Sequence, residues 1–167
     1  MENLVVLSIG SNTGDRAACI IEAVSILEKK FGKKFKKSPV YETPPLYYED
    51  QDDFYNCCVG FRTDINPPEI HEITSSVEDR LGRKRDEKNG PRVIDIDIVF
   101  VGDIIMADNR LTVPHPALQD RLFVLQPAAD IYPEFVHPAM QLTVSELLEE
   151  CPDRSKIKKI DGFWKDR

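Results

Sequence analysis

The chain has 167 residues, 41% of them hydrophobic, and this size suits a full hydrophobic core, so we expect residues 1–167 to form a single domain. No apolar run is long enough to cross a bilayer, and the formal net charge of -7 argues against general binding to nucleic acids. The four cysteines lack metal-ligand spacing, and the first residues lack the basic start of a signal peptide. We therefore expect a reduced, cytoplasmic protein.

The first hundred residues alternate strand and helix patterns. Residues 4–9 are an apolar strand, and Asp15 in the following turn is a helix N-cap. The helix is amphipathic and ends at Gly32; its apolar positions are Ile20, Val24, Leu27 and Phe31. Residues 40–43 and 54–62 have strand patterns. Asn66 and Pro67 then begin a second helix, which ends at Gly82 and has Ile70, Ile73, Val77 and Leu81 on its buried side.

A strand over residues 93–101 completes the order β-α-β-β-α-β. This order predicts an α+β fold with a ferredoxin-like core, an antiparallel sheet with both helices on one face. Beyond the core we expect a C-terminal extension of short helices. One follows Arg121 and ends near Tyr132, and another begins at the capping box of Thr143 and Glu146. The tail either adds a strand or lies loose.

The strand over residues 93–101 carries the first candidate site. It is apolar apart from Asp95 and Asp97, and side chains alternate across a strand, so both aspartates project from one face. The residues predicted on the other face are Ile94, Ile96, Ile98 and Phe100. Two carboxylates so spaced can hold divalent ions, and Mg²⁺ is usually bound by one or two carboxylates together with substrate phosphates. The alternative is an edge strand with a solvated face, although aspartate is uncommon in strands.

The two helices should cover the isoleucine face and leave both aspartates on the open face of the sheet. The same alternation over residues 54–62 places Phe54 and Asn56 on the open face. The residues placed under the helices are Tyr55, Cys57, Val59 and Phe61. Two carboxylates, an aromatic ring and an amide on one surface have the composition of a small-molecule binding site.

Residues 83–92 form a charge-dense loop directly before the aspartates. Arg92 has a planar guanidinium suited to phosphate oxygens, and the other cations of the loop are Arg83, Lys84, Arg85 and Lys88. A charge run is often only a solvated loop. The position of this loop beside the aspartates suits phosphoryl transfer, which is catalysed mainly by positioning and charge neutralisation. The length of the loop suits a lid over bound nucleotide. His115 and Arg121 could extend the same cluster.

Three functions remain open on these residues. The sequence has no Walker A motif and no kinase glycine loop, which excludes the familiar ATP-binding folds. One is metal-dependent transfer of a phosphoryl group from a nucleotide. The second is nucleotidyl transfer or cyclisation, in which enzymes with paired aspartates attack the α-phosphorus and release pyrophosphate. The third function is RNA binding on an open sheet, against which the acidic charge and the lack of an RNP1-like sequence both argue.

Several segments together resemble the hydroxymethyl-dihydropterin pyrophosphokinases of folate biosynthesis. The match runs in order over nearly the whole chain, and GPRVIDID at 90–97 with LTVPHP at 111–116 is highly specific. The other matching segments are SIGSNTGDR at 8–16, VYETPPL at 40–46, FYNCCV at 54–59 and RLFVLQPAADIYP at 121–133. The resemblance implies transfer of pyrophosphate from ATP to the hydroxymethyl group of the reduced pterin, with release of AMP. It also implies two Mg²⁺ ions, small-molecule substrates only, and a monomer.

The resemblance further implies roles for individual residues. The implied metal ligands are Asp95 and Asp97, and the implied catalytic residues are Arg83, Arg85, Arg92 and Asp97, the last also a candidate acceptor for the hydroxyl proton. The implied ATP-binding positions are Glu78, Arg92, Ile98, Arg110, Leu111, Thr112, His115 and Arg121. The implied pterin-binding positions are Thr43, Pro44, Leu46, Phe54, Asn56 and Phe123, with the two phenylalanine rings on either side of the pterin. The sequence departs from the pattern at Phe54, which is Tyr in other members, and at Asn89, which is Trp in some bacterial members.

Overall fold

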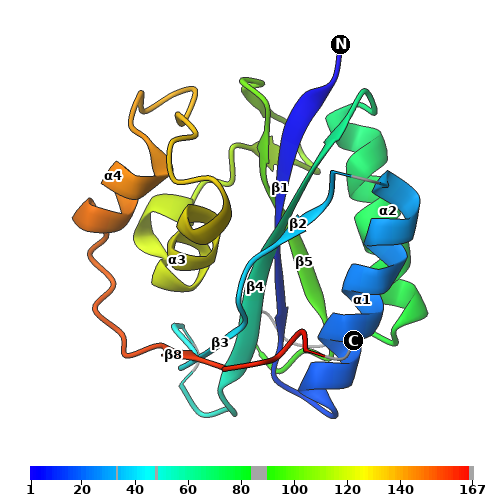
Figure 1. Cartoon of the computed structure of the whole chain (residues 1–167), viewed down its shortest axis with the longest axis vertical. Helices are drawn as coiled ribbons and strands as arrows, with labels where there is room; N and C mark the ends of the chain where they lie inside the picture. Colours follow the sequence, from blue (N-terminus) through cyan, green and yellow to red (C-terminus); the bar gives the residue numbers. More distant parts are fainter. Residues whose placement is uncertain (33, 48, 84–89, 166–167) are drawn as a thin grey trace.

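The computed structural model describes residues 1–32, 34–47, 49–83 and 90–165. A central antiparallel sheet has helices on both faces (Figure 1). Its strands lie in the order β5-β1-β4-β3-β8, and β2 also pairs with β4. The bounds are β1 (Asn3–Ser11), β2 (Lys36–Lys37), β3 (Tyr41–Thr43), β4 (Phe54–Thr63), β5 (Asp95–Val101) and β8 (Lys158–Lys159). The hairpin of β6 (Met106–Ala107) and β7 (Thr112–Val113) lies outside this sheet.

The helices begin where the sequence predicts. They are α1 (Arg16–Phe31), α2 (Pro67–Arg80), α3 (Leu122–Ile131) and α4 (Val144–Glu150), and a 3₁₀ turn, η1, covers Leu118–Asp120. The Asp15 carboxylate accepts a 3.0 Å hydrogen bond from the Ala18 N–H, and the Asn66 side chain caps α2 in the same way. Thr143 and Glu146 form the predicted capping box of α4. No helix in the described part of the chain is long and apolar enough to cross a membrane.

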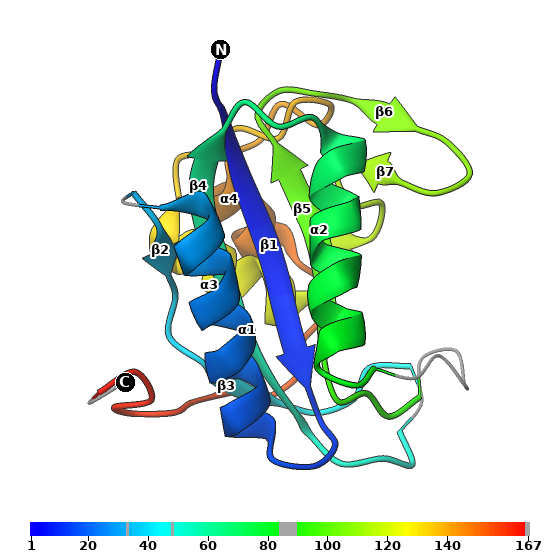
Figure 2. The ribbon, with the colours of Figure 1, turned by 90° about the vertical axis from the view of Figure 1, so that its right-hand side faces the viewer.

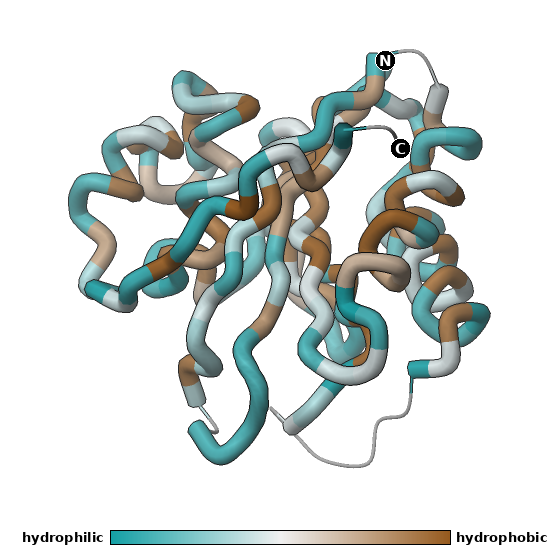
Figure 3. Tube along the Cα trace, turned by 60° about the horizontal axis from the view of Figure 1, so that its bottom comes forward, coloured by the Kyte–Doolittle hydropathy of each residue, from teal (hydrophilic) through white to brown (hydrophobic). Residues whose placement is uncertain are grey.

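Helices α1 and α2 cover one face of the sheet (Figure 2). Beneath them lies the larger core, which is formed by the alternate residues of the central strands, such as Leu7, Ile9, Val59, Ile96 and Ile98. Figure 3 shows hydrophobic residues gathered along the strands and on the helix sides that face them. The predicted combination of an antiparallel sheet with helices is confirmed, and the strand order is consistent with a ferredoxin-like arrangement.

The opposite face of the sheet is half covered, which corrects the prediction that it is open along its whole length. Helices α3 and α4 pack over one end of it (Figure 1), on a second core that includes Val6, Cys58 and Phe100. The remaining end of this face carries the aspartates. The C-terminal extension therefore divides one sheet face into an apolar part and a polar part.

The prediction for Phe100 was wrong. Strand β5 begins at Asp95, later than predicted, and its pairing with β1 shifts between Val6, which lies opposite Phe100, and Leu7, which lies opposite Ile98. Because this irregularity adds one residue to β5, Val99 and Phe100 both belong to the second core. Phe100 therefore packs in the second core, against Phe135 and His137, instead of lying beside Ile98.

Candidate active site

The site is hollow because the central strand has almost no side chain there. On the half-covered face, β1 presents Val6 to the second core and then Ser8 and Gly10. Gly10 lies between Asp95 of β5 and Asn56 of β4 in the strand register. Those two side chains thus stand two strand spacings apart, roughly 10 Å. A glycine within a strand commonly marks such a close approach, and an added Cβ at Gly10 would lie 2.5 Å from Asn56 Oδ1.

Two cavities meet at the aspartates. The first, which we call the inner pocket, is lined by Ser8, Gly10, Thr43, Pro44, Leu46, Tyr47, Gln51, Phe54, Asn56, Arg92, Asp95, Asp97, Arg121 and Phe123. The second, the outer pocket, is lined by His71, Ser75, Glu78, Asp79, Arg83, Asp95, Ile96, Asp97, Ile98, Arg110, Leu111, Thr112, His115 and Pro116. Asp95 and Asp97 line both, so the two carboxylates form a shared wall.

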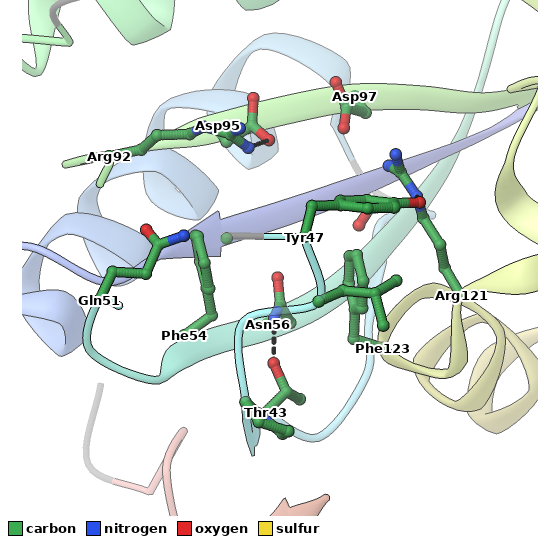
Figure 4. Close-up of a pocket in the computed structure, with 14 residues that line it drawn as sticks. Thr43, Tyr47, Gln51, Phe54, Asn56, Arg92, Asp95, Asp97, Arg121 and Phe123 are labelled. Carbon is green, nitrogen blue, oxygen red and sulfur yellow. Dashed lines mark hydrogen bonds and ion pairs between the residues drawn. The ribbon is translucent and has the colours of Figure 1, made fainter. Parts of the chain in front are cut away.

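The inner pocket has two aromatic sides and a polar floor (Figure 4). Phe54 enters from the first residue of β4 and Phe123 from the first turn of α3. Between them lies Asn56, which is only 4% exposed and donates a 2.7 Å hydrogen bond from Nδ2 to Thr43 Oγ1. This bond fixes the orientation of the amide. A flat heterocycle with polar edges would suit such a slot.

Asp95 is held by two arginines. Its Oδ1 accepts from Arg83 at 2.5 Å and its Oδ2 from Arg92 at 2.9 Å. Arg83 also pairs with Glu78, a buried carboxylate that accepts a 2.8 Å hydrogen bond from the Ile96 N–H. Burial raises the pKa of Glu78, and the Ile96 N–H and Arg83 oppose that rise. Both arginines can exchange a carboxylate partner for a phosphate of the same geometry.

Asp97 has no comparable ion pair with any residue that the structure describes. Burial in the site, with the charge of Asp95 as the next cause, raises the pKa of Asp97 to about 7, while Arg121 opposes the rise. Its side chain is nevertheless 39% exposed, because it faces the pockets. A cation in the pockets could reach this carboxylate and would stabilise its ionised form.

His115 faces Asp97 as a neutral donor. Its Nδ1 accepts a 3.2 Å hydrogen bond from the Ala117 N–H, so the ring hydrogen lies on Nε2, which is 4.0 Å from Asp97 Oδ2. Burial, with Arg121 as the second cause, lowers the pKa of His115 to about 4. The imidazole therefore offers an N–H to the site without adding charge at neutral pH.

The sequence analysis assigned Pro44 and Leu46 of the loop between β3 and β4 to the site, but it missed Tyr47 and Gln51 of the same loop. Tyr47 lines the inner pocket and accepts a 3.2 Å hydrogen bond from Arg121 Nε, and the Arg121 guanidinium lies 5.2 Å from the centre of the Tyr47 ring. Asn12 donates from Nδ2 to Gln51 Oε1 at 2.8 Å, and its Oδ1 accepts from the Arg92 N–H at 2.8 Å. Nothing local in the sequence shows these contacts.

The residues proposed for the two substrates separate into the two pockets with two exceptions, since Arg92 and Arg121 were predicted to bind ATP but line the inner pocket. All six proposed for the pterin line the inner pocket, together with Arg92 and Arg121. Those proposed for ATP that line the outer pocket are Glu78, Ile98, Arg110, Leu111, Thr112 and His115, and Arg83 joins them. Arg85, Lys84, Lys88 and Asn89 lie outside the described residues.

The two aspartates suit a hard divalent cation that shares its coordination with a ligand. Within the described residues there is no group of three or more His, Cys, Asp or Glu side chains that could hold a metal ion alone. Two carboxylates supply only part of an octahedral shell, and Mg²⁺ typically completes such a shell with water and substrate phosphates. The donor set therefore fits Mg²⁺ bound together with a polyphosphate.

Paired carboxylates among arginines, at the junction of an aromatic slot and a polar cleft, define the class of enzymes that transfer phosphoryl groups. The chain belongs to the 7,8-dihydro-6-hydroxymethylpterin-pyrophosphokinase (HPPK) family, whose model matches residues 6–133.

Relatives support this membership. The 2-amino-4-hydroxy-6-hydroxymethyldihydropteridine pyrophosphokinase of Bacillus subtilis is 41% identical over 132 residues, which are 78% of this chain and 79% of that protein. The folic acid synthesis protein FOL1 of Dictyostelium discoideum is 38% identical over 95% of this chain, which spans only 24% of that longer protein. A solved HPPK-DHPS structure from Plasmodium falciparum superposes with a TM-score of 0.68 at 19% identity, over 90% of this chain and 43% of the other, which supports the fold.

Proposed function

We propose that this chain catalyses the reaction for which its family is named, the transfer of pyrophosphate from ATP to the hydroxymethyl group of 6-hydroxymethyl-7,8-dihydropterin, with release of AMP. The observation that carries the proposal is the shared wall: Asp95 and Asp97 line an aromatic pocket on one side and a polar cleft on the other. A reaction that joins a flat heterocycle to a polyphosphate needs both sites to meet at the reacting phosphorus.

In this proposal the pterin ring lies in the inner pocket between Phe54 and Phe123. Aromatic faces hold a flat ring by offset stacking, and the fixed amide of Asn56 would pair with its polar edge. Thr43, Pro44 and Leu46 contribute the rest of the slot. A saturated or non-planar substrate would lose both the stacking and the edge contacts.

ATP would occupy the outer pocket, with adenine and ribose near Ile98, Arg110, Leu111 and Thr112 and with Glu78 on the same side. Its triphosphate would extend over Asp95 and Asp97. Two Mg²⁺ ions bound there would neutralise phosphate charge and orient the β-phosphoryl group.

The surrounding cations would stabilise the negative charge of the transferred group. Arg83 and Arg92 can turn from Asp95 to phosphate oxygens once the carboxylate coordinates a cation, and His115 can donate its Nε2 hydrogen. Arg121, which lines the inner pocket, can do the same. We assign Arg85 to this group from the family pattern. Asp97 is assigned to the metal and not to proton transfer, because a coordinated carboxylate is a weak base.

The chemical step is an in-line displacement. The hydroxymethyl oxygen forms a bond to the β-phosphorus, and the bond from that phosphorus to the oxygen bridging the α- and β-phosphates breaks. AMP leaves with this bridging oxygen, and the hydroxyl proton passes to solvent. The atoms balance without any redox partner, and no covalent enzyme intermediate is required.

The test is a product analysis. The protein is mixed with ATP, Mg²⁺ and the reduced hydroxymethyl pterin, and nucleotides are separated by chromatography with a pterin-free control. We expect AMP that depends on pterin and on Mg²⁺. Release of pyrophosphate instead of AMP would assign the chain to the nucleotidyl transferases, and the absence of any pterin-dependent product would overturn the proposal.

Several broader expectations belong to the same proposal. We assign the core to the ferredoxin-like βαββαβ class and treat residues 1–167 as one pyrophosphokinase domain. We also expect a monomer that works in the cytoplasm. All four cysteines are unpaired, three of them buried, which is compatible with a reducing compartment.

A further inference from the structure

The inner pocket depends on the position of α3, and one polar contact ties that helix to the sheet beside the pocket. The Tyr41 hydroxyl on β3 donates a 2.5 Å hydrogen bond to Asp130 Oδ2 near the end of α3. Neither residue lines the pocket. We propose that Tyr41 and Asp130 are positioning residues, which hold Phe123 at the correct distance from Phe54 for binding of a flat heterocycle. This inference rests on the proposed function of the inner pocket.

The sheet register places Tyr41 in line with the site. Tyr41 lies opposite Asn56 on β4, Asn56 lies opposite Gly10 on β1, and Gly10 lies opposite Asp95 on β5. Residues directly opposite one another in antiparallel strands project from the same face. Tyr41 thus belongs to the row that forms the pocket floor, between Asn56 of β4 and Lys159 of β8, and any movement of α3 against it changes the pocket width.

The helical repeat places Asp130 in line with the aromatic wall. Phe123 and Asp130 are seven residues apart, close to two turns of α-helix, so they lie on the same side of α3. Phe123 is at the beginning of the helix and Asp130 near its end. A contact between Asp130 and β3 therefore fixes the rotation of the helix about its axis, and this rotation determines where the Phe123 ring points.

The apolar side of α3, with Val124, Leu125 and Ala128, packs on the second core, and the bond to Tyr41 is the polar contact that adds a direction to this packing. Cys58 Sγ donates a weak 3.6 Å hydrogen bond to the Val124 carbonyl. The Tyr132 ring lies on Gly60, where an added Cβ would come within 2.2 Å of the ring. This contact lets α3 approach the sheet closely, but within the described residues it has no hydrogen bond that would set the rotation of the helix. Tyr41 is different because it is 7% exposed and its hydroxyl bonds to a charged acceptor. Burial and this hydrogen bond both raise the pKa of Tyr41, so the hydroxyl remains a donor at all physiological pH values.

The experiment compares conservative variants in steady-state kinetics and in binding. Tyr41→Phe removes only the hydroxyl, and Asp130→Ala removes the acceptor. We expect each to raise the KM for the pterin roughly tenfold, less than the ~10²-fold that a 1 Å misplacement can cost, with a change of less than about twofold in the KM for ATP. Asp130→Asn keeps an acceptor oxygen and should restore most of the lost pterin affinity.

Two controls separate positioning from general destabilisation. Tyr55→Phe removes a hydroxyl from the adjoining strand on the helix α1 side of the sheet, and it should leave both KM values unchanged. Fluorescence titration with 6-hydroxymethylpterin measures the slot without turnover, and thermal melts verify that each variant is folded.

The outcomes distinguish the two proposals. An active wild-type protein whose Tyr41→Phe variant keeps its pterin KM, or whose KM values for pterin and ATP rise together, overturns the positioning role alone. No rescue by Asp130→Asn also overturns it. A wild-type protein that makes no pterin-dependent AMP overturns the proposed function instead, and the fluorescence titration then still tests whether Tyr41 controls the slot.

Discussion

Replacement of Asp97 by asparagine should make the protein more stable at alkaline pH, although it removes a residue that we assign to the metal. The reason is the cost of keeping a carboxylate ionised in the site. Burial and the charge of Asp95 raise the pKa of Asp97 from 3.8 to about 7. At pH values between 3.8 and about 7, the folded protein holds a proton on Asp97 that the unfolded chain has released. The free energy of unfolding therefore falls as the pH rises through this range. Asparagine carries no such charge.

The magnitude follows from this pKa and from the exposure of the side chain. At ~1.4 kcal/mol per pKa unit, a rise from 3.8 to about 7 would correspond to ~4 kcal/mol above pH 7. Because 39% of the Asp97 side chain is exposed, solvent screens much of this cost, and we expect a gain of ~1 to 2 kcal/mol. In a chain of this size the gain would raise the Tm by roughly 2 to 8 °C.

Urea unfolding of wild type and Asp97→Asn, without Mg²⁺, at pH 8 and at pH 4.5 measures the effect. The gain should be fully present at pH 8 and reduced to roughly a quarter at pH 4.5, where folded wild type carries the proton and the unfolded chain has begun to release it. The variant should also lose pterin-dependent AMP formation, at least about a hundredfold, because a metal ligand is gone. Equal or lower stability than wild type at pH 8, or a gain that does not depend on pH, would refute the reasoning.

Three other substitutions probe the neighbours of Asp97. Asp95→Asn should have the opposite effect and lower the free energy of unfolding by ~2 kcal/mol at pH 7, because Arg83 and Arg92 lose the carboxylate that they share. An unchanged urea unfolding curve would contradict this. Gly10→Ala should push Asn56 out of place and raise the pterin KM about tenfold with little change for ATP, and a rise for both substrates would count against the separation of the pockets. His115→Gln should leave the shape of the pH profile between pH 6 and 8 unchanged, because the histidine is already neutral there; the loss of a titration step in that range would show that the histidine titrates after all.

Local sequence patterns determined the helices α1 to α4, the main strands of the core and one half of the site, but not β2, the β6–β7 hairpin or the turn η1. The caps at Asp15 and Asn66 predicted where α1 and α2 begin, since a cap satisfies backbone N–H groups within a few residues. The alternation along β5 and β4 predicted that Asp95, Asp97 and Asn56 share a face, and they line one pocket. These features depend on dihedral periodicity and on short-range hydrogen bonds, which the sequence records directly.

The tertiary structure decided what depends on distant partners. The irregularity that turns Phe100 into the second core arises from the pairing of β5 with β1, which alternation within one strand cannot reveal. The contact of Arg121 with Tyr47 joins residues 74 positions apart, and the bond between Tyr41 and Asp130 joins residues 89 positions apart. Contacts of this range form only when the whole sheet and its covering helices assemble, because they are set by packing geometry and not by local propensity.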